Sequence, residues 1–256
     1  MSNLAGSIAV AALVSIAAPG AAQVPPEARA AGFGKLVFAE DFSNFDVGWD
    51  GTGAHRWYPM KSLGKPVGRE MSGRTGDAFR MRTPPDPKRG ANTSFVTFSA
   101  GQGATSTSFG FGYYEGRLRF RPDVNNWNSF WLVGDGPLIR PGKPTTGCEI
   151  DIAESMGPIG PRVYGGTVHE WRQGKATHNK NALIHLPDGA ELSQWNRFGM
   201  LWTKTRITWF LNGKPISSAP TPAACKSARL HLIFGAAKFG GVEDQALDMS
   251  WIRVYR

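Results

Sequence analysis

Several features that mark large classes of protein are missing from this sequence. Beyond the first 22 residues, no apolar run approaches the length of a membrane span, which predicts that the mature protein is soluble and has no membrane partner. No segment has the pattern of a long amphipathic helix, and charged residues make up only 19% of the chain. Cys148 and Cys225 are the only cysteines, so the chain can form a single disulfide at most. Alternation along a strand would point Cys148 into the core, where a disulfide and a buried free thiol both remain open.

Acidic residues are scarcer than basic ones. The chain has 20 Asp and Glu against 29 Lys and Arg, a formal net charge of +9. Such a balance can indicate an anionic partner, either nucleic acid or an acidic polysaccharide. The basic residues are dispersed, with no run of five and no nucleic-acid-binding motif, which favours a solvated surface and predicts no nucleic-acid partner. An acidic or sulfated glycan remains an alternative partner.

Glycine, proline and short strand-like segments are abundant. The 32 Gly and 18 Pro residues indicate strands joined by turns. Ten candidate strands follow one another between turn signals: Leu36–Phe42, Phe95–Ser99, Gly112–Phe120, Ser129–Val133, Cys148–Glu154, Gly165–Glu170, Asn196–Trp202, Ile207–Leu211, Leu230–Gly235 and Met249–Tyr255. We therefore predict an all-β fold, a two-sheet β-sandwich that forms one domain over residues 35–256.

The N-terminal segment has the pattern of an export signal. Residues 1–22 carry no charge, run apolar from Leu4 to Ala18 and end in small residues, although no basic residue precedes the apolar core. The apolar run is too short to span a bilayer. We expect residues 1–22 to be a signal peptide, residues 23–34 to be a loosely packed linker, and the protein to be secreted or periplasmic.

The most informative segment is Glu149-Ile150-Asp151-Ile152-Ala153-Glu154, three carboxylates within an apolar strand pattern. On a regular strand Glu149 and Asp151 share one face, whereas Glu154 points to the other. A β-bulge near Ile152 and Ala153 would shift the alternation and return Glu154 to that face. Successive positions on one face are about 6 to 7 Å apart, and twist with the bulge brings the outer pair toward the roughly 5 to 5.5 Å carboxyl separation of retaining glycosidases.

Carboxyl groups this close titrate in separate steps. One stays ionised while another keeps its proton to higher pH, so a single strand can supply a nucleophile and a general acid. The alternatives are a chance acidic strand and a structural cation site. The nine Trp residues, several of them in loops or at strand ends, suit a saccharide cleft because an indole stacks on the apolar face of a sugar ring. Core packing is the alternative for any one of them.

The sequence resembles glycoside hydrolase family 16 over about residues 33–256. Seven segments carry the resemblance in order: Leu36–Phe42, Gly112–Leu118, Asn126–Leu132, Glu149–Glu154, Gly166–His169, Trp209–Lys214 and Met249–Tyr255. It implies a concanavalin-like jelly roll with an open cleft on its concave sheet. It also implies an endo-acting enzyme on β-linked polysaccharides that needs no cofactor.

The resemblance implies a role for each acidic residue of the hexapeptide. Glu149 is expected to be the nucleophile, Glu154 the acid/base, and Asp151 the residue that tunes both. The reaction would then be retaining, through a covalent glycosyl-enzyme intermediate that water opens with Glu154 acting as base.

Four further residues occupy positions that line the family's cleft, and we expect them to contact sugar: Glu115, Arg117, Trp127 and His169. From the residues alone, Glu115 and Arg117 also fit a cross-strand ion pair, Trp127 a surface aromatic and His169 a core imidazole. The family often has Asp where this chain has Ser250, as part of a calcium site. We therefore predict no metal among the site residues, and a structural calcium ion stays a doubtful alternative.

Departures from the family pattern bear on the substrate. Laminarinase-like members usually show Trp-Pro-Ala where this chain has Trp127-Asn128-Ser129, which weakens a β-1,3-glucan assignment. The Glu-x-Asp-x-x-Glu spacing also occurs in enzymes that act on agar, carrageenan and porphyran. We predict a secreted, monomeric, retaining endo-β-glycanase that hydrolyses β-1,3- or mixed β-1,3/1,4-linked polysaccharide. The alternatives are a hydrolase of an acidic galactan or exopolysaccharide, a non-catalytic glycan-binding module, and a transglycosylase on the same fold.

Overall fold

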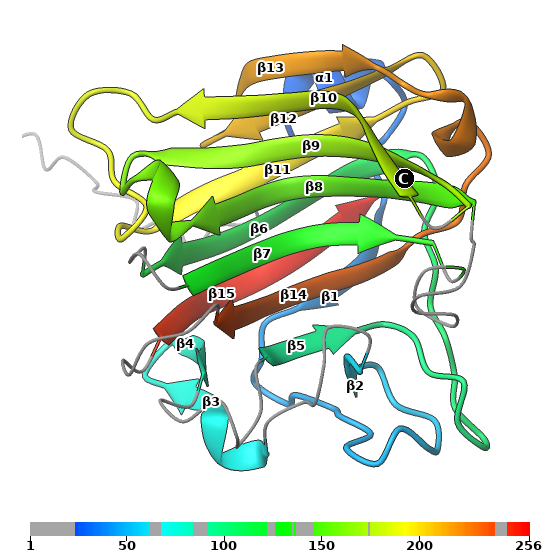
Figure 1. Ribbon diagram of the computed structural model, residues 1–256, viewed down its shortest axis with the longest axis vertical. Helices are drawn as coiled ribbons and strands as arrows, with labels where there is room; N and C mark the ends of the chain where they lie inside the picture. The colour runs from blue at the N-terminus through cyan, green and yellow to red at the C-terminus, as the bar shows by residue number, and fades with distance from the viewer. Residues whose placement is uncertain are drawn as a thin grey trace, which may run out of the picture.

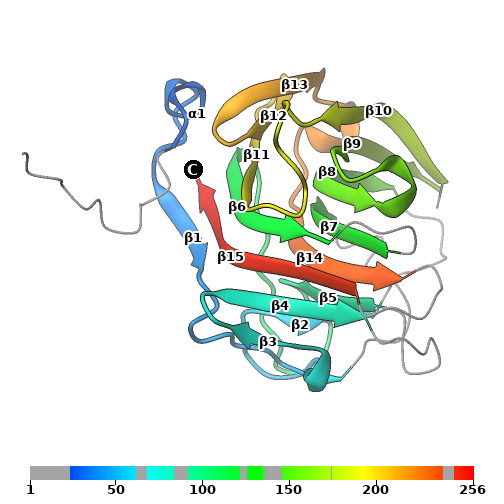
Figure 2. The same ribbon diagram turned by 90° about the vertical axis from the view of Figure 1, so that its left-hand side faces the viewer.

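Antiparallel strands make up nearly all the regular structure of the protein. The computed structural model describes residues 24–61, 68–83, 92–121, 126–134, 136, 146–173, 175–238 and 245–256. Within these ranges the strands form two sheets stacked face to face (Figures 1 and 2), which confirms the predicted β-sandwich. In the described part of the chain, no helix has the length and apolarity that a membrane span requires.

The seven-stranded sheet lies at the front of Figure 1 and runs in the order β10-β9-β8-β7-β14-β5-β2. Its strands are, in that order, Lys175–His185, Val163–Arg172, Gly147–Met156, Asn126–Val133, His231–Lys238, Asn92–Val96 and Tyr58–Pro59.

The eight-stranded sheet runs in the order β13-β12-β11-β6-β15-β4-β3, and β1 also pairs with β15. Its strands are, in that order and ending with β1, Lys214–Pro220, Arg206–Leu211, Asn196–Trp202, Gly112–Phe120, Gln245–Tyr255, Ala78–Thr83, Ser72–Thr75 and Leu36–Glu40. The short helices are α1 (Pro26–Ala30), η1 (Arg69–Met71), η3 (Gly157–Ile159) and η4 (Ala223–Cys225).

Each of the ten predicted strands overlaps an observed one, and five strands lack a prediction: β2, β3, β4, β10 and β13. β10 and β13 lie at the ends of their sheets, where one side of a strand is unpaired. Pro215 and Pro220 are tolerated in β13 because an edge strand needs fewer ladder hydrogen bonds. Edge strands therefore carry weaker alternation than the central strands do.

The core lies between the sheets and follows the two-residue period of the strands. In β6, Tyr114, Leu118 and Phe120 are fully buried in this core, whereas Tyr113 belongs to a separate cluster on the outer face. A β-carbon built on Gly116 would lie 3.1 Å from the Phe130 ring of the opposite sheet, which confirms that even-numbered positions of β6 face inward. Odd-numbered positions of β6 therefore face away from the seven-stranded sheet.

Part of the predicted linker is well packed. Helix α1 lies against the outer face of the eight-stranded sheet (Figure 2), where Ala28 is fully buried together with Tyr113 and Phe210. The expectation of loose packing is wrong for this helix, because its small apolar residue fills a site between aromatic side chains. The predicted signal peptide, residues 1–22, lies outside the described residues.

Cys148 and Cys225 form a disulfide, with their Cα atoms 5.1 Å apart. Both residues are buried, which confirms the expected core position of Cys148. Of the two alternatives left open by the sequence, the disulfide is the one that the structure contains. The bond ties the start of β8 to η4, 77 residues further along the chain. Glu149, the residue after Cys148, is thus attached to a cross-linked position.

Candidate active site

Strand β8 contains the predicted bulge. On its β7 side, Phe130 pairs with Ala153 and the next residue, Trp131, pairs with Asp151, so Ile152 is the extra residue. The register with β9 shifts over the same stretch. Ile152 and Ala153 both lie in the core between the sheets, and the bulge returns Glu154 to the outer face that carries Glu149 and Asp151.

A tryptophan from the other sheet supports the bulge. Trp209 of β12 donates from Nε1 to the main-chain oxygen of Asp151 at 2.8 Å, across the core. A bulge interrupts the strand ladder, so a buried carbonyl at this point needs another donor. Gly166 of β9 leaves room for the indole, because a β-carbon at this position would lie 2.9 Å from Trp209 Nε1.

Glu149 is held by one strong hydrogen bond. Trp171 of β9 donates from Nε1 to Glu149 Oε2 at 2.7 Å, and His169 Nε2 lies 3.9 Å from Oε1. Burial raises the pKa of Glu149 to about 7, against the lowering effects of the His169 charge and the Trp171 hydrogen bond. The nearby charge of Glu154 raises it further. Near neutral pH this carboxyl group is thus able to ionise.

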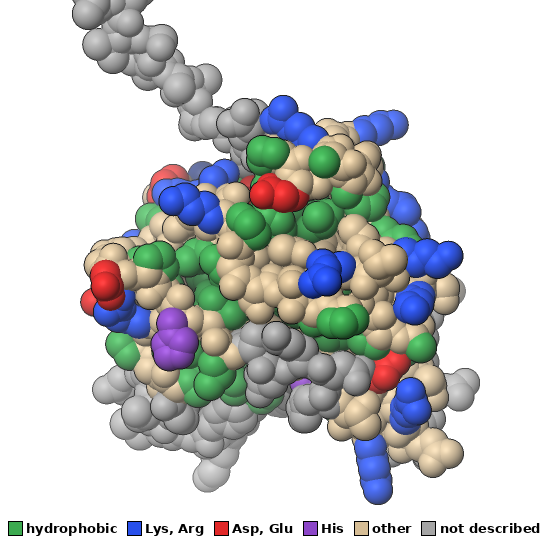
Figure 3. Space-filling model, turned by 90° about the horizontal axis from the view of Figure 1, so that it is seen from above, with side chains coloured by type: hydrophobic (Ala, Val, Ile, Leu, Met, Phe, Trp, Pro, Cys, Tyr) green, Lys and Arg blue, Asp and Glu red, His purple; other side chains and the backbone are tan. Residues whose placement is uncertain are grey.

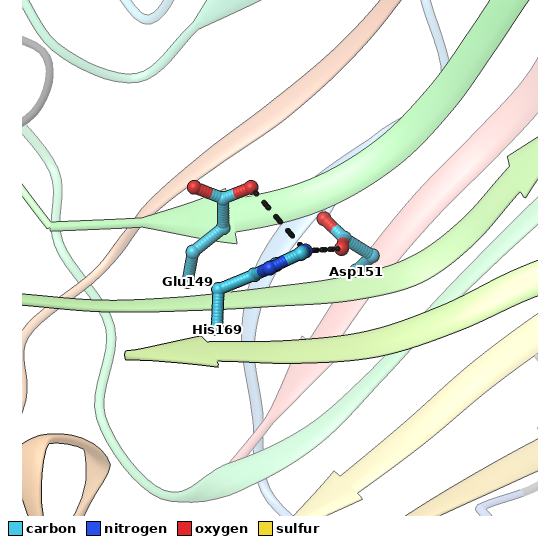
Figure 4. Close-up of side chains that lie close together, drawn as sticks. All are labelled: Glu149, Asp151 and His169. Carbon is cyan, nitrogen blue, oxygen red and sulfur yellow. Dashed lines mark hydrogen bonds and ion pairs between the residues drawn. The ribbon is translucent and has the colours of Figure 1, made fainter. Parts of the chain in front are cut away.

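Asp151 lies deeper and contacts the same histidine. Its Oδ2 is 2.9 Å from His169 Nε2, and Figure 4 shows the imidazole between the two carboxyl groups. Asp151 is fully buried, and burial followed by the charge of Glu149 raises its pKa well above the ordinary value. Within the described residues, its Oδ1 has no hydrogen-bond partner. Asp151 therefore favours the protonated form while Glu149 is charged.

Glu154 has its own indole donor. Trp127 of β7 donates from Nε1 to Glu154 Oε1 at 2.8 Å. Burial raises the pKa of Glu154 to about 8, and the charge of Asp151 adds to this effect. At neutral pH Glu154 therefore keeps its proton, which is the state that a general acid needs.

The two glutamates thus differ in pKa in the way that suits a nucleophile and a general acid. One carboxyl group ionises near neutral pH, the other stays protonated, and both are placed by the same strand. Beside them, Trp131 and Val133 of β7 pair in register with Asp151 and Glu149 and belong to an apolar cluster on this face of the sheet. Carboxyl groups beside an apolar, aromatic surface suit a sugar ring with one polar edge and one apolar face.

The comparison with known families agrees with this geometry. The family model described as glycosyl hydrolases family 16 matches residues 77–228, more than half of the chain. The chain belongs to glycosyl hydrolase family 16. Membership confirms the resemblance seen in the sequence, and the matched region includes the bulged strand with all three acids.

Two curated relatives in Rhizobium meliloti (strain 1021) carry the description endo-1,3-1,4-beta-glycanase. EglC is 30% identical over 135 residues, 52% of this chain and 26% of EglC. ExsH is 26% identical over 167 residues, 62% of this chain and 33% of ExsH. The chain thus spans about a quarter to a third of the length of these relatives.

Solved structures of the family share the fold. The laminarinase from Flavobacterium sp. UMI-01 superposes with a TM-score of 0.65 at 16% identity, over 87% of this chain and all of that one. This likeness confirms the jelly-roll form of the sandwich.

The structure brings together five of the seven predicted site residues: Glu149, Asp151, Glu154, Trp127 and His169. Trp171 was not predicted, although it lies two residues beyond His169 on the same strand and therefore on the same face. Applying the two-residue period to the whole of β9 would have found it.

Glu115 and Arg117 do not reach this family 16 site. Both lie on the outward positions of β6 in the eight-stranded sheet, so the whole core separates them from Glu149. Glu115 is fully buried and accepts a hydrogen bond from the Tyr113 hydroxyl at 3.0 Å, while Arg117 stacks on Trp195. The expectation that these two residues contact sugar in the cleft is wrong, because strand alternation gives a face but not the sheet to which a strand belongs.

Some of the site residues could also act as metal ligands. Among the described residues, one set of His, Cys, Asp and Glu side chains has ligand atoms within 4.8 Å of one another, and it is Glu149, Asp151 and His169. These three side chains belong to the candidate active site described above. Ser250, where the family often has Asp, lies at a register shift of β15 between Met249 and Trp251.

Proposed function

We propose that this protein is an endo-acting glycoside hydrolase that cleaves β-1,3- or mixed β-1,3/1,4-linked polysaccharide with retention of configuration. The observation that carries the proposal is the bulged strand, which presents Glu149 and Glu154 on one face with an indole donor for each. Family membership and the descriptions of EglC and ExsH support the substrate class.

The reaction follows from the ionisation of the two glutamates. The Glu149 carboxylate attacks the anomeric carbon as Glu154 gives its proton to the departing glycosidic oxygen, so that one C–O bond forms and another breaks. Glu154, now a carboxylate, takes a proton from water, and that water displaces Glu149 from the sugar. Both glutamates return to their starting states, and the step needs no cofactor.

Asp151 and His169 would regulate this exchange of protons. Asp151 lies beside Glu149 on the strand and shares His169 with it. Glu149 loses its negative charge when it forms the glycosyl-enzyme. Ionisation of Asp151 then costs less free energy, because no charged carboxylate lies beside it, so Asp151 can take over the negative charge of the pair.

We also propose that the protein is located outside the cytoplasm and is a monomer. The disulfide supports an oxidising compartment, and the apolar N-terminal segment has the pattern of an export signal.

The test is reducing-sugar release from a panel of β-1,3-glucan, mixed-linkage glucan, cellulose, agarose and carrageenan. The protein is compared with Glu149→Gln and with Glu27→Gln, a change at an exposed residue of α1. We expect release from the β-1,3-containing glucans, loss of release in Glu149→Gln and no change in Glu27→Gln. Retained turnover in Glu149→Gln would contradict the proposal.

The panel also separates the alternatives. Release from agarose or carrageenan alone would assign a galactan as substrate. Glycan binding without any release would indicate a binding module, and products longer than the substrate would indicate a transglycosylase.

A further inference from the structure

The outer face of the eight-stranded sheet is rich in arginine. On the central strands β4, β15, β6 and β11, the side chains that point away from the core include six arginines: Arg80, Arg82, Arg117, Arg119, Arg197 and Arg253. We call these six residues the arginine face. The outward carboxylates on the described part of the same strands are Glu115 and Asp248, and both are fully buried. Six cations against two buried anions leave a net positive surface.

The side of the molecule that Figure 3 shows differs from this arginine face. Figure 3 views another side of the molecule, and there Lys and Arg side chains are scattered with acidic ones between them. On the arginine face, Asp248 takes hydrogen bonds from two arginines at once: Arg80 Nε at 2.7 Å and Arg119 Nε at 2.8 Å. These arginines lower the pKa of Asp248, so the three side chains together carry a positive charge.

Three arginines of this face lie over tryptophan rings, and Arg119 shares the Trp195 ring with Arg117 at 4.9 Å from its centre. The Arg117 guanidinium lies 4.5 Å from the centre of the Trp195 ring, and that of Arg253 lies 5.0 Å from the Trp251 ring. Among the described residues, neither Arg117 nor Arg253 has a carboxylate oxygen within 4.0 Å, and the charge of Arg253 acts at longer range on Asp41 and Glu115. A guanidinium stacks on a ring through its flat face, whereas its N–H groups point outward along its edge. A carboxylate binds to that edge in bidentate fashion, so stacking does not block it.

Arg117 and Arg253 are neighbours on this face. Arg117 pairs in register with Trp251, and Arg253 pairs with Glu115, so Arg117 and Arg253 are diagonal partners on adjacent strands, with Cβ atoms about 7 Å apart. Both side chains are partly exposed. The face thus presents two preoriented cationic forks side by side, next to aromatic rings.

We propose that the arginine face is a second polysaccharide-binding surface, which holds carboxylate-bearing chains on the side of the sandwich opposite the catalytic residues. This proposal rests on the proposed function, because a polysaccharide hydrolase encounters such polymers. Planar forks match carboxylates, and aromatic rings beside them suit a sugar chain. Nucleic acid and anionic lipid also carry negative charge, and the experiment tests both.

The test measures binding in a Glu149→Gln background, which stops turnover. Isothermal titration calorimetry at low salt compares carboxymethylated laminarin with unmodified laminarin. We expect R117Q/R253Q to weaken binding of the carboxymethylated polymer about three- to tenfold, as two exposed ion pairs would give, and to leave the unmodified polymer unaffected. The matched control is K204Q/K226Q, which removes two exposed charges that do not belong to the arginine face. It is expected to change neither affinity.

Each other outcome would overturn the proposal. An equal loss in K204Q/K226Q would assign the binding to overall charge, and no loss in R117Q/R253Q would remove these residues from the surface. Tighter binding of a single-stranded oligonucleotide or of phosphatidylglycerol vesicles, also lost in R117Q/R253Q, would assign another partner. If R117Q/R253Q melts at a lower temperature than the unchanged protein, R117K/R253K is measured in its place. This variant keeps both charges but lacks the planar forks, and we expect its affinity for the carboxymethylated polymer to lie between those of the unchanged protein and R117Q/R253Q.

The readout is independent of the proposed hydrolysis. With Glu149 restored, R117Q/R253Q is expected to release sugar from unmodified laminarin at the rate of the unchanged protein. Absence of hydrolysis in every variant would refute the proposed function, while the binding comparison would still decide the role of the arginine face.

Discussion

Trp209, in the core of the sandwich, donates a hydrogen bond to the main-chain oxygen of Asp151 at 2.8 Å. The bond links the two sheets at the point where the bulge interrupts the ladder of β8. The position of Glu154 relative to Glu149 thus depends on a residue that contacts neither carboxyl group and lies on the opposite sheet.

Trp209→Phe is expected to reduce both stability and turnover. It leaves a buried carbonyl without its donor, at a cost of about 1 to 3 kcal/mol, and it frees the bulge that aligns the two glutamates. Urea unfolding and kcat on a β-1,3-containing glucan measure the two effects. The control is Trp202→Phe, since Trp202 is also fully buried but its Nε1 has no partner among the described residues. Equal losses in the two variants would show that only ring packing matters.

The indole donors of the glutamates predict changes on different limbs of the pH–activity profile. Trp171→Phe removes a hydrogen bond that favours charged Glu149, so its pKa should rise and the acidic limb should move to higher pH. Trp127→Phe removes the corresponding bond to Glu154, and there the basic limb should move to higher pH. Profiles of kcat/KM measure both limbs. Movement of the same limb in both variants would contradict the assignment of roles.

Azide distinguishes the nucleophile from the acid/base. With an aryl β-glycoside as substrate, Glu149→Ala leaves room for azide on the face opposite the leaving group and is expected to yield an α-glycosyl azide. Glu154→Ala still forms the glycosyl-enzyme, which azide opens to a β-glycosyl azide. Without azide each variant should lose at least about a hundredfold in turnover of the polysaccharide. Proton NMR of the products gives the configuration, and an exchange of the two products would reverse the roles.

Stability is expected to fall as the pH rises through the neutral range. The pKa values of Glu149 and Glu154 are raised to about 7 and about 8 in the folded protein, so the folded state binds protons more tightly than the unfolded chain does. The resulting stabilisation is complete below pH 4.5 and is lost as the pH approaches 8. Glu154→Gln should therefore become more stable than the unchanged protein between pH 5 and 8, by about 1 to 3 kcal/mol. Denaturant unfolding measures the difference, and Glu191→Gln, an exposed control, should show none.

The disulfide predicts a large loss of stability on its removal. A bridge across 77 residues restricts the unfolded chain, and its loss in Cys148→Ala/Cys225→Ala is expected to cost about 2 to 5 kcal/mol. Thermal unfolding with and without a reducing agent measures the effect. The reducing agent should lower the melting temperature of the unchanged protein and leave that of the double variant unaltered.

The sequence predicted the bulged strand β8 well, because the spacing of its acidic residues is a local constraint. Three acids at this spacing can share a face only if one residue is extra, and the bulge at Ile152 follows from that condition alone. The central strands were found for a similar reason, since each carries a two-residue period that short segments reveal.

The remaining features depend on contacts between distant segments. Arg117 and Glu149 each lie on a well-predicted strand, but pairing among strands decides that they face opposite sides of the molecule. The donor from Trp209 to Asp151 joins residues 58 positions apart, and no local pattern indicates it. Trp171 is different, because its position relative to His169 was available from the period of the strand.

The placement of both glutamates on β8 has a consequence for how substrate preference can change. β8 is paired on both sides, by β7 and β9, and these same two strands supply the indole donors. The positions of the two glutamates, which we propose as the reacting groups, thus do not depend on the segments that connect the strands. Exchange of those connections between homologous proteins can alter which sugars are admitted while the reacting groups keep their spacing, so libraries that vary only the connecting segments offer a direct route to new linkage preferences.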